Sequence, residues 1–241
     1  MTAAASHIME QLKRAILPLE TAVGKPSMGA DLGLGAIAAA FPGNQFPTGV
    51  IHEFIYSNPS HGAATGGFVS GILGKLMRKQ GASIWINAAA DIFPPALANY
   101  GIAPENIIFI TVKKEKDILW TMEEALKCEG ITAVVGELQE LSFTASRRLQ
   151  LAVEKSKSTG FVLRCNPKAE NITSCVSRWK ITPLPGITNG LPGVGFPAWK
   201  VHLLKVRNGR PGSWDMTYAA GRFSRLVSDL PVVRPVQSKT G

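Results

Sequence analysis

The residues whose types and spacing suggest chemistry lie between positions 50 and 67. An apolar, β-branched and aromatic run over 50–56 predicts a buried strand, and a stretch rich in Ser, Asn, Pro and Gly over 57–67 predicts a loop. An apolar helix is expected from about residue 68 to 77. Strand, small-residue loop and helix is the layout of a phosphate-binding P-loop, in which backbone N–H groups, a Lys and a Ser or Thr hold the phosphates and Mg²⁺.

The charged and metal-binding side chains that this chemistry requires are missing from the loop. Alanine or glycine stands where a P-loop has its Lys and its Ser or Thr, and no Lys or Arg occurs from residue 26 to 74. Phosphoryl transfer depends on positive charge placed against the phosphates, so we expect no ATP hydrolysis, no enzymatic activity and no bound cofactor. An ordinary strand-to-helix turn is the alternative interpretation. The residues of this vestigial P-loop are Ser57, Gly62, Ala63, Ala64 and Thr65, of which Thr65 is the nearest substitute hydroxyl.

Composition places the chain among globular proteins. It has 241 residues, 45% of them hydrophobic and 18% charged, which is enough for one large domain. No apolar run approaches the ~20 residues of a membrane span, and the N-terminus lacks a signal pattern, so a cytoplasmic protein that does not span a membrane is predicted. The three cysteines and four histidines have no disulfide or metal-ligand spacing, so reduced thiols and no metal site are expected.

Charge is distributed unevenly along the sequence. Residues 1–146 hold 10 Lys and Arg against 13 Asp and Glu (net −3), whereas residues 147–241 hold 16 against 4 (net +12). Such asymmetry indicates a face that meets DNA or an acidic partner, although a solvated basic surface would give the same count. The candidate contact residues are Arg147, Arg148, Lys205, Arg207 and Arg210.

The chain divides into a short N-terminal helix, a core and a tail. An amphipathic helix within residues 1–23 precedes a core domain over 24–228, and residues 229–241 are predicted to be disordered. Within the core, buried strands are expected at 50–56, 83–87, 106–112, 131–137 and 160–165, separated by helices at 68–80, 94–100, 116–129 and 142–157.

Strands that alternate with helices predict an α/β fold with a mostly parallel, twisted sheet and helices on both faces. After a further strand at 178–182 and a Pro/Gly-rich loop at 183–197, two strands at 199–206 and 213–218 predict a C-terminal antiparallel hairpin. Functional crevices of such sheets lie at the carboxyl ends of the strands, where the 57–67 loop, Asn87 and Glu137 would meet.

This order of elements resembles the RecA recombinase core, with residues 32–53 similar to the lead-in to its P-loop. The chain resembles the ImuA family more closely, the RecA-like component of the inducible mutagenesis cassette of many bacteria. This resemblance covers about residues 30–225 and rests on four stretches, at 117–126, 147–152, 190–199 and 205–214.

The resemblance implies a RecA-like core that has lost its motor chemistry, with Glu137 as a vestigial Walker B acid. It also implies a non-catalytic adaptor in error-prone, translesion DNA repair. The implied partners are an ImuB-like inactive homologue of Y-family polymerases and an error-prone replicative-type DNA polymerase, with RecA and DNA as further candidates. Two alternatives stay open: a cell-division inhibitor resembling SulA, and a residual nucleotide-binding ATPase that uses the glycine-rich loop.

Overall fold

The computed structural model describes residues 29–79, 81–88, 92–188, 193 and 195–226. The predicted N-terminal helix and the predicted disordered tail therefore lie outside the described residues. Among the helices in these ranges, none combines the length and apolarity needed to cross a bilayer.

Nine strands form one sheet in the described part of the chain, in the order β3-β2-β4-β5-β1-β6-β7-β8-β9. The strands are β1 (Ile51–Tyr56), β2 (Ala82–Asn87), β3 (Ile107–Thr111), β4 (Ile131–Leu138), β5 (Thr159–Cys165), β6 (Ser177–Ile187), β7 (Phe196–Val206), β8 (Gly212–Ala219) and β9 (Arg222–Arg225). The α-helices are α2 (Pro59–Leu76), α3 (Glu115–Leu126) and α4 (Phe143–Ser156), and short 3-10 helices are η1 (Gly35–Ala40), η2 (Pro42–Asn44), η3 (Met77–Lys79), η4 (Pro94–Tyr100) and η5 (Pro104–Asn106).

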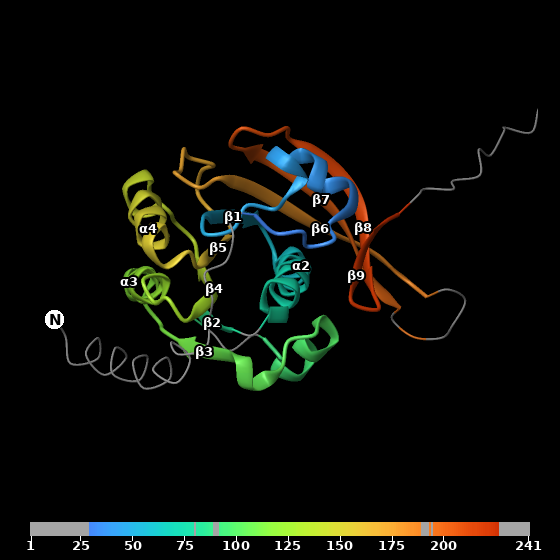
Figure 1. Cartoon of the computed structure of the whole chain (residues 1–241), viewed down its shortest axis with the longest axis horizontal. Helices are drawn as coiled ribbons and strands as arrows, with labels where there is room; N and C mark the ends of the chain where they lie inside the picture. The colour runs from blue at the N-terminus through green and yellow to red at the C-terminus, as the bar shows by residue number, and fades with distance from the viewer. Residues whose placement is uncertain (1–28, 80, 89–91, 189–192, 194, 227–241) are drawn as a thin grey trace, which may run out of the picture.

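The sheet confirms the predicted α/β fold. Strands β3, β2, β4, β5, β1 and β6, in this spatial order, pair in parallel. Strands β7, β8 and β9 continue the same sheet in antiparallel pairing. Helices α3 and α4 cover one face, whereas α2 lies on the other, and the antiparallel strands curve around it (Figure 1). The predicted C-terminal hairpin is formed by β7 and β8, and β9 adds a strand that the sequence analysis did not predict.

The segment 183–197 corrects the prediction of a Pro/Gly-rich loop, because strands β6 and β7 extend into it from both sides. Proline is tolerated in β6 because β1 pairs with β6 only through Ser177, Arg178 and Trp179. Beyond Trp179 no strand in the described part of the chain pairs with this edge of β6, so a backbone N–H missing from that edge breaks no ladder there.

Helix α2 is buried on most of its circumference, and glycines let its neighbours approach closely. A Cβ at Gly71 would lie 2.6 Å from the Phe223 ring, and a Cβ at Gly74 would lie 1.9 Å from the Tyr100 carbonyl oxygen. Phe68 of the same helix makes an edge-to-face contact with Trp199, with ring centroids 5.8 Å apart. The helix therefore fills the concave side of the sheet at a packing distance that larger side chains would not permit.

The other face of the sheet packs on amphipathic helices, as the sequence predicts. The apolar stripe of α3, which includes Ile118, Met122 and Leu126, is buried against the sheet. Ser142 caps the N-terminus of α4 by accepting a hydrogen bond from the Ala145 N–H at 3.1 Å.

His52 of β1 is a fully buried, neutral histidine with both ring nitrogens satisfied. Its Nε2 donates to the Pro47 carbonyl oxygen at 2.9 Å, and its Nδ1 lies 2.6 Å from Ser177 Oγ, which also accepts from Trp179 Nε1. This chain of bonds assigns the tautomer with the proton on Nε2. Burial lowers the pKa of His52 to about 4, partly opposed by the bond to Pro47.

Because the folded-state pKa of His52 is lowered, the unfolded chain takes up this proton first as the pH falls. The stability contributed by neutral His52 is complete above about pH 6.5 and is lost progressively towards pH 4. We expect a non-titrating His52→Gln variant to lose about 2 kcal/mol less stability than the wild type between pH 7 and pH 5. Urea denaturation at the two pH values measures this difference. Identical pH dependence of the two proteins would show that folding does not lower the pKa of His52.

Candidate functional site

The junction between β1 and α2 differs from the predicted loop. Only Ser57 and Asn58 separate the strand from the helix, which begins at Pro59 rather than near residue 68. Asn58 Oδ1 accepts hydrogen bonds from the His61 backbone N–H at 2.9 Å and from Ser60 Oγ at 2.8 Å. Asn followed by Pro is a helix-start signal, with Asn as N-cap and Pro at the first helical position, and it overrides the loop-like composition.

Four of the five predicted P-loop residues consequently lie in α2, and only Ser57 lies before it. The Thr65 hydroxyl, the expected substitute for a metal-binding side chain, is buried and donates to the His61 carbonyl oxygen at 2.7 Å. Gly62 faces the Tyr56 ring, which a Cβ at this position would approach to 3.0 Å. The segment that would form a phosphate cradle is thus the first turns of a capped helix.

Glu137 lies near the carboxyl end of β4, as predicted, and is half-buried. Its Oε1 accepts a hydrogen bond from Trp85 Nε1 of the neighbouring strand β2 at 2.8 Å. Asn87, at the end of β2, is buried. The Glu137 carboxylate therefore binds an indole N–H of the sheet itself.

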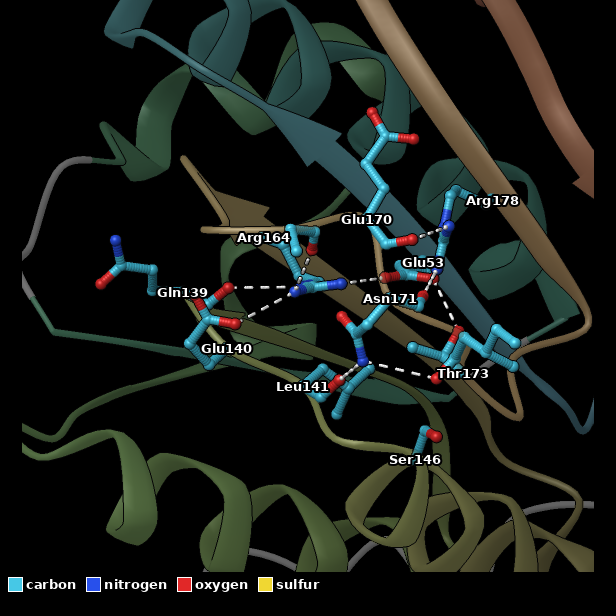
Figure 2. Close-up of polar contacts among 12 residues, drawn as sticks. Glu53, Gln139, Glu140, Leu141, Ser146, Arg164, Glu170, Asn171, Thr173 and Arg178 are labelled. Carbon is cyan, nitrogen blue, oxygen red and sulfur yellow. Dashed lines mark hydrogen bonds and ion pairs between the residues drawn. The ribbon is translucent and has the colours of Figure 1, made fainter.

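A buried ion network is centred on Glu53 of β1 (Figure 2). Glu53 Oε1 pairs with Arg164 Nη1 at 2.7 Å, and Oε2 pairs with Arg178 Nε at 2.9 Å. The Thr173 hydroxyl donates to Oε2 at 2.8 Å. Both Glu53 and Arg164 are fully buried, and the three charged residues come from the adjacent strands β1, β5 and β6.

Arg164 Nε donates to the Gln139 carbonyl oxygen at 3.3 Å, and other guanidinium N–H groups of the network bind the connection between β5 and β6. Arg164 donates to the Ala169 carbonyl oxygen at 3.3 Å, and Arg178 donates to the carbonyl oxygens of Glu170 and Asn171. Arg164 also reaches Glu140 Oε2 at 3.4 Å, so two carboxylates face the two arginines. Burial of such charges costs less when each is paired and hydrogen-bonded, and here the contacts fix the backbone of residues 169–173.

Sequence reasoning missed this network. The available signal was the presence of Glu53, Arg164 and Arg178 inside segments predicted as strands, because an unpaired charge is not tolerated in the interior of a sheet. Pairing them requires knowing that β1 lies between β5 and β6, which local patterns do not reveal.

The predicted basic contact residues fall into two groups. On α4, Arg147 is exposed, and Arg148 pairs with Glu123 at 2.5 Å. On β7 and just after it, Lys205 Nζ donates to the Thr173 carbonyl oxygen and Arg207 Nη2 to that of Ser174, each at 3.1 Å. Arg210 is exposed in the turn before β8. The structure thus brings Lys205 and Arg207 together over the connection that covers the Glu53 network.

The fold and this site define an α/β protein with a mixed, mostly parallel sheet, C-terminal antiparallel strands and a capped helix that begins at Pro59, separated from β1 by two residues. No family model matches the chain. Protein ImuA of Caulobacter vibrioides strain NA1000 is 34% identical over 232 residues, which cover 88% of this chain and 94% of the relative. The chain therefore belongs to the ImuA family. The cell division inhibitor SulA of Photorhabdus laumondii is 26% identical over 138 residues, covering 54% of this chain and 78% of that protein.

Proposed function

We propose that this protein is a non-catalytic adaptor in DNA-damage-induced, error-prone DNA synthesis. The observation that carries the proposal is the start of α2 at Pro59, because the expected phosphate cradle is a helix whose first turn is capped by Asn58. No Lys or Arg stands from residue 26 to 74 to meet a triphosphate. Membership of the ImuA family supports the mutagenesis context.

An adaptor acts by contact with other macromolecules. We infer that its partners are an inactive homologue of Y-family polymerases and an error-prone replicative-type polymerase, with RecA as a further candidate. Direct DNA contact through Arg147, Arg148, Lys205, Arg207 and Arg210 stays a prediction. The SulA-type function is less well supported because that similarity covers 54% of the chain, against 88% for ImuA.

Two measurements on the purified full-length protein test the proposal. Isothermal titration calorimetry with ATP and Mg²⁺ is expected to show no saturable binding, whereas an active RecA protein measured alongside binds. Co-purification from damage-treated cells is expected to recover the inactive polymerase homologue. Micromolar ATP affinity, or turnover, would restore the ATPase interpretation. A protein that blocks division when overproduced, without altering damage-induced mutation frequency, would instead be a SulA-type inhibitor.

A further inference from the structure

The connection between β5 and β6 joins two basic elements into one surface. Ser174 N–H donates to Ser146 Oγ of α4 at 2.9 Å, and Asn171 Nδ2 donates to the Leu141 carbonyl oxygen, just before α4, at 2.8 Å. On its other side the connection is held by Lys205 and Arg207, as described above. Figure 2 shows Ser146, Asn171 and Thr173 together at this place. Helix α4, the connection and the end of β7 are therefore neighbours.

Large apolar side chains are exposed on all three of these elements. Ile172, in the connection, is 78% exposed, and Leu204 of β7 is 41% exposed. On α4, Phe143 and Leu151 are 54% and 48% exposed, and they lie four residues on either side of Arg147, on one stripe of the helix. Single exposed apolar residues are common, but a group of four on adjoining elements indicates an interaction site.

This surface carries three available basic side chains, and Glu154 of α4 and Glu170 of the connection are exposed beside them. Among the described residues, Arg147, Lys205 and Arg207 have no carboxylate partner, since Lys205 and Arg207 bind only main-chain oxygens. Arg148, by contrast, is paired with Glu123. The nearby Glu140 is engaged with Arg164 and with the Lys168 N–H. A complementary partner would therefore carry acidic and apolar side chains together.

The surface is also rigid where it is most exposed. Arg164 and Arg178 of the Glu53 network donate hydrogen bonds to the carbonyl oxygens of residues 169–171. The Thr173 hydroxyl donates to Glu53 itself. Ile172 lies between these anchored residues, so little backbone entropy remains to be lost when a partner covers it. An apolar anchor on a preorganised backbone is typical of residues that dominate binding energy.

We propose that this surface, which we call the Ile172 surface, docks an acidic amphipathic helix of the polymerase-homologue partner. The surface comprises Phe143, Arg147, Leu151, Ile172, Leu204, Lys205 and Arg207. Acidic residues of the partner helix meet the basic side chains, and its apolar stripe covers Ile172 and Phe143. The inference rests on the proposed function. A protein partner is favoured over DNA because phosphate contacts use basic and polar groups and gain nothing from exposed aliphatic side chains.

The test compares two charge introductions at exposed apolar positions. Ile172→Asp is expected to weaken binding of the purified polymerase homologue at least tenfold, measured by calorimetry with the full chain. The matched control is Phe93→Asp, at an apolar side chain that is 70% exposed before η4, and it should bind like the wild type. Arg147→Glu should also weaken binding and reduce its salt dependence. Because these side chains are exposed, the variants should fold, which equal urea midpoints would verify.

The outcomes separate this inference from the adaptor function. Wild-type affinity in both Ile172→Asp and Arg147→Glu would overturn the Ile172 surface and leave the adaptor intact. Failure of the wild type to bind the homologue would overturn both. Binding of single-stranded DNA by the wild type that is lost in Ile172→Asp, while the homologue still binds, would assign the surface to DNA and overturn the proposal.

Discussion

Replacement of Glu53 by Ala should destabilise the protein by about 3–5 kcal/mol, the range typical when one partner of a buried ion pair is removed. Glu53 is fully buried and neutralises Arg164 at 2.7 Å and Arg178 at 2.9 Å. Without its carboxylate, two buried guanidinium groups would face each other with only Glu140 nearby. Urea denaturation of the wild type and the variant measures the difference in the free energy of unfolding.

The control for Glu53→Ala is Arg148→Ala, which removes an ion pair at the surface. The Arg148 side chain is 55% exposed, and Glu123 keeps Lys127 as a partner at 3.3 Å. Loss of such a pair costs less than about 1 kcal/mol. If Glu53→Ala cost no more than Arg148→Ala, the network would not be a buried, mutually dependent unit, and the connection over it would be held by other contacts.

Gly74→Ala should destabilise the protein by about 1–3 kcal/mol or more, as overpacking of a tight core does. The added Cβ would lie 1.9 Å from the Tyr100 carbonyl oxygen, which belongs to the backbone and cannot rotate away. Helix α2 or η4 must shift to accept the methyl group, and the concave side of the sheet loses its close packing. Thermal and urea unfolding would both detect the loss.

Gly66→Ala, in the same helix, is the matched control. A Cβ at Gly66 meets no atom within 4 Å, so the substitution should be neutral or should stabilise α2 by about 0.5–1 kcal/mol through its higher helix propensity. Equal effects of the two substitutions would contradict the close approach of Tyr100 to Gly74, because helix propensity alone favours Ala at both positions.

Much of the fold follows from local sequence patterns. The alternation of apolar strands with amphipathic helices predicted β1 to β5 and helices α3 and α4 within a few residues of their observed bounds. Gly101, in the left-handed conformation, ends η4, and Ser142 begins α4, because these residue types satisfy helix termini by short-range bonds. The hairpin of β7 and β8 was likewise signalled by its turn residues.

The β1–α2 junction shows where a sequence template misled the prediction. The local helix-start signal at Asn58 and Pro59 was present, but the resemblance to a P-loop favoured a loop up to residue 67. Asn58 Oδ1 accepts a hydrogen bond from the His61 backbone N–H, three residues later. Because this cap is local, the start of α2 was predictable from the sequence. The absence of Lys and Arg near the junction was also visible in the sequence. The expectation of no ATP hydrolysis rests on this absence, whether the segment is a loop or a helix.

By itself, the sequence determined the α/β class, the missing cations and the basic C-terminal third. Only the tertiary structure decided that Glu53 pairs with Arg164 and Arg178, residues 111 and 125 positions away, and that Ile172 lies beside α4 and β7. The physical reason is the range of the interactions. Helix periods and caps act over a few residues, whereas the partners of a buried charge depend on which strands become neighbours in the sheet, and that choice is made by the packing of the whole chain.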